Sequence, residues 1–140
     1  MALDVLVVDD SAAIRKILVR VLTQTDLELG QILEAGDGAE ALQSLEARPA
    51  GLVLCDINMP TMDGMEFLAA VRARQEWSKV PVIMVTIECS QSRVEEALRL
   101  GAQGYVRKPF TADQIKEKIA TCMANIRREG FAHVPQRPQP

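Results

Sequence analysis

The chain has 140 residues, of which 48% are hydrophobic, and this is enough apolar side chain for a single domain with a real core. Its 16 basic and 19 acidic residues give a formal net charge of -3, so it lacks the overall basic field that drives non-specific binding to nucleic acid. The N-terminus lacks a basic n-region, and no apolar run approaches the ~18 residues of a membrane span. We therefore expect a soluble, cytoplasmic protein that contacts neither a membrane nor nucleic acid directly.

Five short runs rich in valine and isoleucine alternate with segments whose apolar residues recur every three or four positions. This alternation is typical of β-α units built around a parallel sheet. Continuous apolar runs suit strands buried on both faces, whereas the short, mixed run "QILEA" suits an edge strand. The predicted strands span residues 3–8, 31–35, 52–55, 80–85 and 104–106.

The segments between these strands carry helix signals. Apolar stripes mark the first and last helices, and each stripe needs a sheet to cover it. Pro49 and Gly101 are predicted to close two helices. Residues suited to cap the starts of the second to fifth helices are Asp37, Asp63, Ser90 and Thr111.

The C-terminal residues depart from this pattern. After residue 127 the apolar periodicity is lost and prolines accumulate, so the last helix is not expected to continue far. We predict one domain over residues 1–127, followed by residues 128–140 as a disordered tail or the stump of a linker. The only histidine, His133, lies in this tail, which leaves the folded part without the commonest general base.

Three cysteines, Cys55, Cys89 and Cys122, are odd in number and have no C-x-x-C spacing. Neither a disulfide framework nor a zinc site is indicated, and we predict reduced thiols in a reducing compartment. Redox sensing at Cys89 is the alternative for one of them, because this residue follows the fourth predicted strand closely.

Polar residues stand where four of the five predicted strands end. The first strand gives Asp9 and Asp10, the third gives Asp56, the fourth gives Thr86, and Lys108 lies just beyond the fifth. In the flavodoxin-like strand order 2-1-3-4-5, ligands bind at the carboxyl edge between the first and third strands, where the order reverses. The acidic residues stand on those two strands, so order and chemistry predict the same site.

The charges indicate what this site holds. Three ionised carboxylates are balanced by one divalent cation and the Lys108 ammonium, and oxygen ligands without histidine favour Mg²⁺. Because adjacent strand residues point to opposite faces, we expect Asp10 to bind the ion directly and Asp9 to bind it through water. Such a site suits phosphoryl transfer, with Asp56 as a nucleophile that forms an acyl phosphate.

Five motifs carry a family resemblance. They are "VLVVDDS", "EAGDGAEAL", "LVLCDINMPTMDGMEF", "VPVIMVTIE" and "GAQGYVRKPF", in this order along the chain. Together they make residues 3–127 closely similar to the receiver domain of bacterial two-component response regulators, particularly the single-domain CheY type. The resemblance implies a flavodoxin-like (βα)5 fold, a five-stranded parallel sheet of order 2-1-3-4-5 with helices on both faces.

The resemblance also implies roles at the site. Asp56 would be the phosphoacceptor, Asp9 and Asp10 the acidic pair, and Asn58 the residue whose backbone carbonyl binds Mg²⁺. Lys108 would pair with a phosphoryl oxygen. The bond between Lys108 and Pro109 matches a cis peptide of the family.

Further roles concern the switch and its timing. Thr86 is similar to the family's switch hydroxyl and Tyr105 to its switch aromatic residue. The resemblance places Asn58 and Glu88 at two variable positions that, in the family, tune hydrolysis of the acyl phosphate. Ile87 departs from the small residue usual at its position, and we expect its side chain to slow the access of donors or water to the site.

The implied partners are a sensor histidine kinase or histidine phosphotransfer protein as donor, and a downstream protein such as a flagellar motor component or another regulator. The signalling surface would comprise the fourth helix, the fifth strand and the fifth helix. Exposed basic residues on or near that surface could contact such a partner: Arg93, Arg99, Arg107 and Lys116.

Alternatives to a phosphorylated switch remain open. The chain could be a receiver module cut from a larger multidomain regulator, or a receiver that binds constitutively. An aspartate-nucleophile phosphohydrolase is remote, because Asn58 stands where such an enzyme needs a second aspartate to move a proton. We therefore predict a protein that catalyses only its own phosphorylation and dephosphorylation, and not an enzyme acting on another substrate.

Overall fold

The computed structural model describes residues 2–136, and it describes side chains as far as residue 125. Five parallel strands form one sheet in the order β2-β1-β3-β4-β5, which confirms the predicted fold class. The strands are β1 (Leu3–Val8), β2 (Leu29–Ala35), β3 (Leu52–Cys55), β4 (Val82–Thr86) and β5 (Gly104–Arg107). The helices are α1 (Ala12–Thr23), α2 (Gly38–Ala47), α3 (Gly64–Ala73), α4 (Gln91–Arg99) and α5 (Ala112–Gln136), with a 3₁₀ turn, η1, at Gln75–Trp77.

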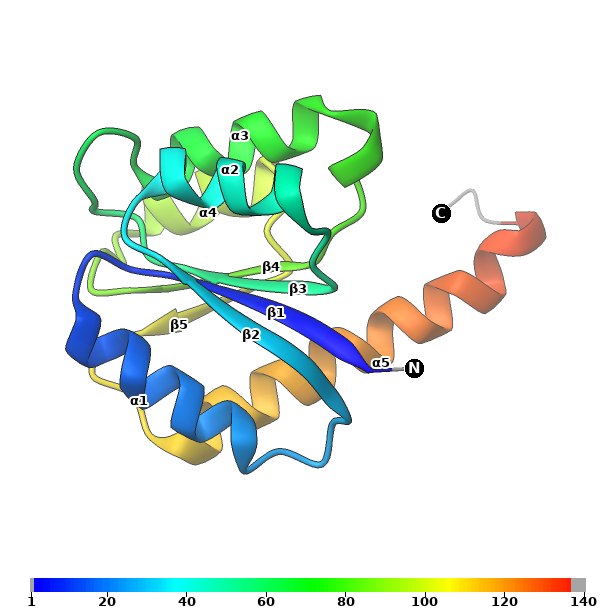
Figure 1. Cartoon of the computed structure of the whole chain (residues 1–140). Helices are drawn as coiled ribbons and strands as arrows, with labels where there is room; N and C mark the ends of the chain where they lie inside the picture. The colour runs from blue at the N-terminus through cyan, green and yellow to red at the C-terminus, as the bar shows by residue number, and fades with distance from the viewer. Residues whose placement is uncertain (1, 137–140) are drawn as a thin grey trace.

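Helices cover both faces of the sheet, with α1 and α5 on one face and α2, α3 and α4 on the other (Figure 1). Each face has its own buried cluster, because the strand side chains alternate between the two. One cluster includes Leu18 and Leu22 of α1 with Ile115 and Ile119 of α5. Phe67 of α3, which is completely buried, lies in the other.

Three strands differ in extent from the predictions, the fifth only in that it ends at Arg107 instead of residue 106. The second begins at Leu29 instead of residue 31, because a register shift between Leu3 and Val5 brings Leu3 opposite Leu29. The fourth spans Val82–Thr86 instead of residues 80–85. Pro81 lacks an N–H, so it joins the sheet only through its carbonyl, which accepts a bond of 2.9 Å from the Val53 amide.

The helix starts have the predicted caps. Asp37, Asp63 and Ser90 each accept a hydrogen bond from the backbone N–H three residues later. The Thr111 hydroxyl accepts from the Gln114 amide, and Gln114 returns a bond to the Thr111 amide. These caps fix where α2, α3, α4 and α5 begin, and thereby the length of each loop at the carboxyl edge of the sheet.

The last helix is longer than predicted. α5 continues past residue 127 to Gln136 and extends well beyond the sheet (Figure 1). The expectation that it stops soon after residue 127 is wrong, because arginine, glutamate and alanine in "RREGFAHV" are good helix formers even without an apolar stripe. Pro135 removes only one N–H near the end of the helix. Residues 137–140 lie outside the described residues, and the assignment of 128–140 as a tail stays a prediction.

Among the helices that the structure describes, none combines the length and the apolar character that crossing a membrane requires.

Candidate functional site

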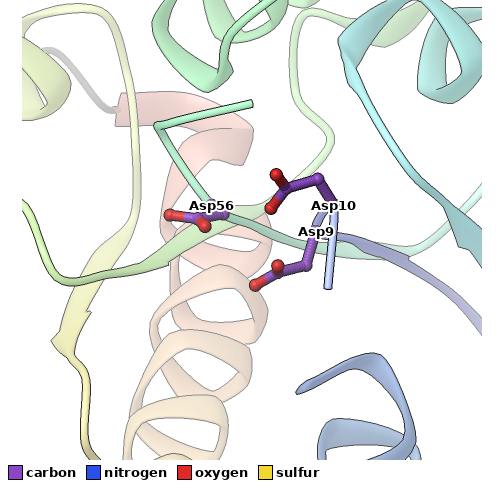
Figure 2. Close-up of side chains that lie close together, drawn as sticks. All are labelled: Asp9, Asp10 and Asp56. Carbon is purple, nitrogen blue, oxygen red and sulfur yellow. The ribbon is translucent and has the colours of Figure 1, made fainter. Parts of the chain in front are cut away.

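The three predicted acidic residues meet at the carboxyl edge of the sheet (Figure 2). Asp9 and Asp10 follow the end of β1, and Asp56 follows the end of β3, the strand beside it. One carboxylate oxygen of each residue lies within 4.8 Å of those of the other two. Parallel strands end at the same edge, so residues far apart in the sequence form one cluster there.

Lys108 completes this cluster. Its Nζ donates to Asp9 Oδ2 at 2.7 Å and to Asp56 Oδ2 at 3.0 Å. Burial by itself would lower the pKa of the Lys108 ammonium, but the hydrogen bonds to the two carboxylates outweigh it and leave the pKa raised. The lysine therefore remains charged and lies between the two buried acids. The peptide bond that follows it, to Pro109, is cis as predicted.

Asp56 is held from both sides. The Ile57 amide donates to its Oδ1 at 2.7 Å, while Lys108 binds its Oδ2. The next residue is held as well, because the Gly64 amide at the start of α3 donates to the Ile57 carbonyl at 2.7 Å. A Cβ on Gly64 would lie 2.0 Å from the Asp56 carbonyl oxygen, so only glycine allows this approach.

The members of the acidic pair have different surroundings. Asp9 is buried, and its Oδ1 accepts from the Ser11 amide at 2.9 Å while its Oδ2 binds Lys108. Burial raises the pKa of the Asp9 carboxyl, although Lys108 and Ser11 act in the opposite direction. Asp10 is exposed, and within the described part of the chain no hydrogen bond or ion pair engages its carboxylate. Asp10 is thus the member with unengaged oxygens.

This donor set fits a hard divalent cation. All three ligand groups are carboxylates, which suit Mg²⁺ and disfavour softer metals. Two oxygens bound directly to one Mg²⁺ lie roughly 2.9 to 4.2 Å apart. The three oxygens lie within 4.8 Å of one another, so one ion can engage all three, either directly or through water. Because both aspartates lie past the end of β1, strand alternation does not separate them, and the unequal roles of Asp9 and Asp10 stay a prediction.

Thr86 and Tyr105 are connected through the backbone of Glu88. The Glu88 amide donates to Thr86 Oγ1 at 3.2 Å, and the Tyr105 hydroxyl donates to the Glu88 carbonyl. Thr86 is completely buried at the end of β4 and Tyr105 is half-buried on β5. Burial, with Cys89 and Glu88 nearby, raises the pKa of Tyr105 to about 12, so its hydroxyl remains a donor at neutral pH.

The other predicted residues lie on β3 or in the segments that follow β3 and β4. Asn58 is exposed two residues after Asp56, and its carbonyl's role toward Mg²⁺ stays a prediction. The Ile87 side chain is 71% exposed on the loop that follows β4. Cys89 is half-buried, with its Sγ 3.9 Å from the Thr86 carbonyl oxygen. Cys55 is buried, and burial raises the pKa of its thiol, as expected of an unreactive cysteine.

Two residues at the site had not been predicted. Gly64 stands within a quoted motif, but its role depends on how closely α3 approaches β3, which no sequence pattern encodes. Arg15 of α1 donates from Nη1 to the Asp9 carbonyl oxygen at 2.5 Å, and from Nε to Glu34 of β2 at 2.8 Å. Nothing in the sequence pattern distinguishes Arg15 from a solvent-exposed arginine on the polar side of a predicted helix, so these two contacts could not be predicted.

Known proteins are similar to this chain in sequence and in fold. A sequence model of the response regulator receiver domain matches residues 5–120. The chemotaxis protein CheY of Pseudomonas aeruginosa is 42% identical over 115 residues, which are 82% of this chain and 91% of that protein.

Solved structures agree with this relationship. Chemotaxis protein CheY4 of Vibrio cholerae superimposes with a TM-score of 0.79 at 31% identity, over 87% of this chain and 99% of that chain. A complex of CheX, CheY, BeF3 and Mg²⁺ from Borrelia burgdorferi matches with a TM-score of 0.79 at 27% identity, over 86% of this chain and 89% of that chain. With the acidic cluster, Lys108 and the strand order in place, the chain belongs to the response regulator receiver domain family and is of the CheY type.

Proposed function

We propose that the protein receives a phosphoryl group on Asp56, in a Mg²⁺-dependent transfer from a phosphohistidine of a sensor histidine kinase or histidine phosphotransfer protein. The observation that carries this proposal is the position of Lys108, whose ammonium binds both Asp9 and Asp56 beside the three-carboxylate cluster. A structural ion pair would need only one carboxylate, whereas phosphoryl transfer needs several charges arranged around a nucleophile.

The transfer forms one bond and breaks one. A carboxylate oxygen of Asp56 attacks phosphorus, the P–N bond to the donor imidazole breaks, and its electron pair returns to the ring nitrogen. The Ile57 amide holds Asp56 Oδ1 in place. Lys108, which binds Asp56 Oδ2, can move toward a phosphoryl oxygen. Bound Mg²⁺, held by Asp10, Asp56 and the acidic partner Asp9, would supply charge neutralisation as the phosphoryl group approaches.

The product would change the contacts of the loop after β4. A phosphoryl group adds about 1.5 to 2 negative charges and new acceptor oxygens next to Thr86. The Thr86 hydroxyl can then bind the phosphoryl group, and the loop residue Glu88 moves with it because its amide binds Thr86 Oγ1. Since the Glu88 carbonyl accepts from Tyr105, this movement reaches the outer side of β5.

The surface that would change comprises α4, β5 and α5. A hollow of about 450 Å³ lies there between β5 and α5, and Tyr105 is one of the residues that line it. Arg107, Gln114 and Lys118 supply polar groups around it. This surface suits a protein partner that distinguishes the contacts of Tyr105 before and after phosphorylation, such as a flagellar motor component or another regulator.

CheY of Pseudomonas aeruginosa and CheY4 of Vibrio cholerae are chemotaxis proteins, and their similarity favours a chemotaxis pathway for this chain. We also propose that it acts in the cytoplasm. We further propose that the protein acts on no other substrate and catalyses only its own phosphorylation and dephosphorylation. The complex of CheX with CheY, BeF3 and Mg²⁺ from Borrelia burgdorferi gives a precedent for a protein partner of a CheY.

The decisive experiment maps the phosphoryl group. The protein is incubated with Mg²⁺ and acetyl phosphate, or with a phosphorylated cognate kinase, and the acyl phosphate is trapped by borohydride reduction and located by mass spectrometry. We expect label on Asp56 alone, none in Asp56→Asn or with EDTA, and wild-type labelling in Asp37→Asn, which alters a helix cap outside the cluster. Ile87→Ala should be labelled and hydrolysed faster.

Two results would overturn the proposal. One is label on a residue other than Asp56, and the other is no label with either donor. Equal rates for Ile87→Ala and the wild type would remove the role of Ile87 alone. Beryllofluoride, which mimics the phosphoryl group, can then be used to capture the partner from an extract and to identify it.

A further inference from the structure

Arg15 connects the acidic pair to the neighbouring strand. Its Nη1 donates to the Asp9 carbonyl oxygen at 2.5 Å, and its Nε donates to Glu34 Oε1 at 2.8 Å. The side chain is only 19% exposed, while that of Glu34 is 42% exposed. Arginine's planar fork can hold two acceptors at fixed positions, and here it joins α1, the loop after β1, and β2.

The position of Asp10 depends on this contact. No partner in the described part of the chain holds the Asp10 carboxylate, so its position is constrained only through the backbone to which it is attached. The Asp9 carbonyl belongs to the planar peptide unit that also contains the Asp10 nitrogen and Cα. A hydrogen bond to that carbonyl oxygen therefore fixes the plane from which the Asp10 side chain starts.

Other bonds fix the residues on either side of this peptide unit. The Asp9 amide donates to the Ala35 carbonyl at 3.0 Å, and the Asp9 carboxylate accepts from the Ser11 amide at 2.9 Å. These bonds hold the Asp9 amide and side chain, and neither involves the Asp9 carbonyl. Among the described residues, Arg15 thus supplies the one hydrogen bond to the carbonyl of the Asp9–Asp10 peptide unit.

We propose that Arg15 is a positioning residue that aims Asp10 at the Mg²⁺ site and thereby raises the affinity of the protein for Mg²⁺. The inference rests on the proposed Mg²⁺-dependent function. The alternative to positioning is a purely electrostatic role, in which the positive charge of Arg15 weakens the binding of Mg²⁺. Glu34 neutralises the guanidinium, which favours positioning over repulsion. The two roles differ in sign, so one measurement separates them.

The test measures the Mg²⁺ dissociation constant of the wild type and of Arg15→Ala by isothermal titration calorimetry, well below the melting temperature of each. Positioning predicts binding about tenfold weaker in Arg15→Ala, as is typical when a partner outside the ligand set is removed. In NMR spectra without Mg²⁺, the amide signals of Asp10 and Ser11 should shift or broaden, while that of Ile57 stays in place.

The matched control is Arg48→Ala. Arg48 also forms an ion pair with an acid of β1, Asp4, but at the opposite end of the strand. This variant should bind Mg²⁺ like the wild type. Equal or tighter binding by Arg15→Ala, or an equal loss in Arg48→Ala, would overturn the role of Arg15. Absence of Mg²⁺ binding by the wild type would overturn the proposed function as well, so the two failures can be told apart.

Discussion

At the scale of single residues, the site depends on how unequally its carboxylates are engaged. Both oxygens of Asp9 already have partners, Lys108 and the Ser11 amide. Asp56 has Lys108 and the Ile57 amide. Asp10 is the exposed member, so its oxygens meet an incoming ion without first giving up a protein contact. The three aspartates are therefore expected to contribute differently although they lie within one cluster.

Substitutions in the acidic pair test this difference. Asp10→Asn should abolish Mg²⁺-dependent phosphorylation of Asp56, whereas Asp9→Asn should weaken it less, because Asp9 is expected to act through water. The measurement is the rate of labelling by acetyl phosphate as a function of Mg²⁺ concentration. Equal losses in the two variants would refute the assignment of direct and indirect ligands.

At the scale of secondary structure elements, the site depends on how α3 begins. Its capping box, in which Asp63 and Glu66 exchange hydrogen bonds, starts the helix next to the backbone of Asp56. The Gly64 amide then binds the Ile57 carbonyl. The start of α3 and the end of β3 are thereby coupled, so a change in one moves the other.

Gly64→Ala tests this coupling. The added Cβ would lie 2.0 Å from the Asp56 carbonyl oxygen and 2.8 Å from Ile57 Cα, so backbone must shift. We expect a loss of about 1–3 kcal/mol in the free energy of unfolding, measured by urea denaturation, together with slower labelling of Asp56. The control is Gly36→Ala, whose Cβ would approach nothing closer than Glu40 Oε1 at 3.4 Å. Equal stability of the two variants would contradict the prediction.

At the scale of the whole molecule, the site places three carboxylates near one another, and the Lys108 ammonium binds two of them. This concentration of charge opposes folding, and a bound divalent cation relieves it. Strand order is what makes the cluster possible, because β1 lies beside β3 at the centre of the sheet. The same order leaves β2, which contributes no residue to the cluster, at an edge.

Mg²⁺ should therefore stabilise the fold. At a concentration of 100 times its dissociation constant, a cation that binds only the folded state adds about 2.7 kcal/mol, which for a domain of this size raises the melting temperature by roughly 8–10 °C. Calorimetry with Mg²⁺, compared with KCl of equal ionic strength, measures this shift. Asp10→Asn should lose most of it, and a shift that persists in that variant would place the ion elsewhere.

Much of this protein was determined by local sequence. The alternation of apolar runs with amphipathic segments predicted all five strands and the edge position of β2. This is because the spacing of apolar residues along the sequence reflects whether one or both faces of an element are buried. The caps of the last four helices were predicted because a polar side chain at the N-cap accepts a hydrogen bond from a backbone amide of the first helical turn. The acidic residues were predicted because strand ends converge on one edge.

Tertiary structure decided what depends on distance between elements. The hydrogen bonds of Lys108 to two aspartates, the approach of Gly64 to Asp56 and the reach of Arg15 to the Asp9 carbonyl join segments that sequence patterns treat separately. The length of α5 was also missed, because helix propensity continued after the apolar stripe had ended. Periodicity records which face of an element is buried, whereas contacts between polar groups depend on the three-dimensional positions of whole elements.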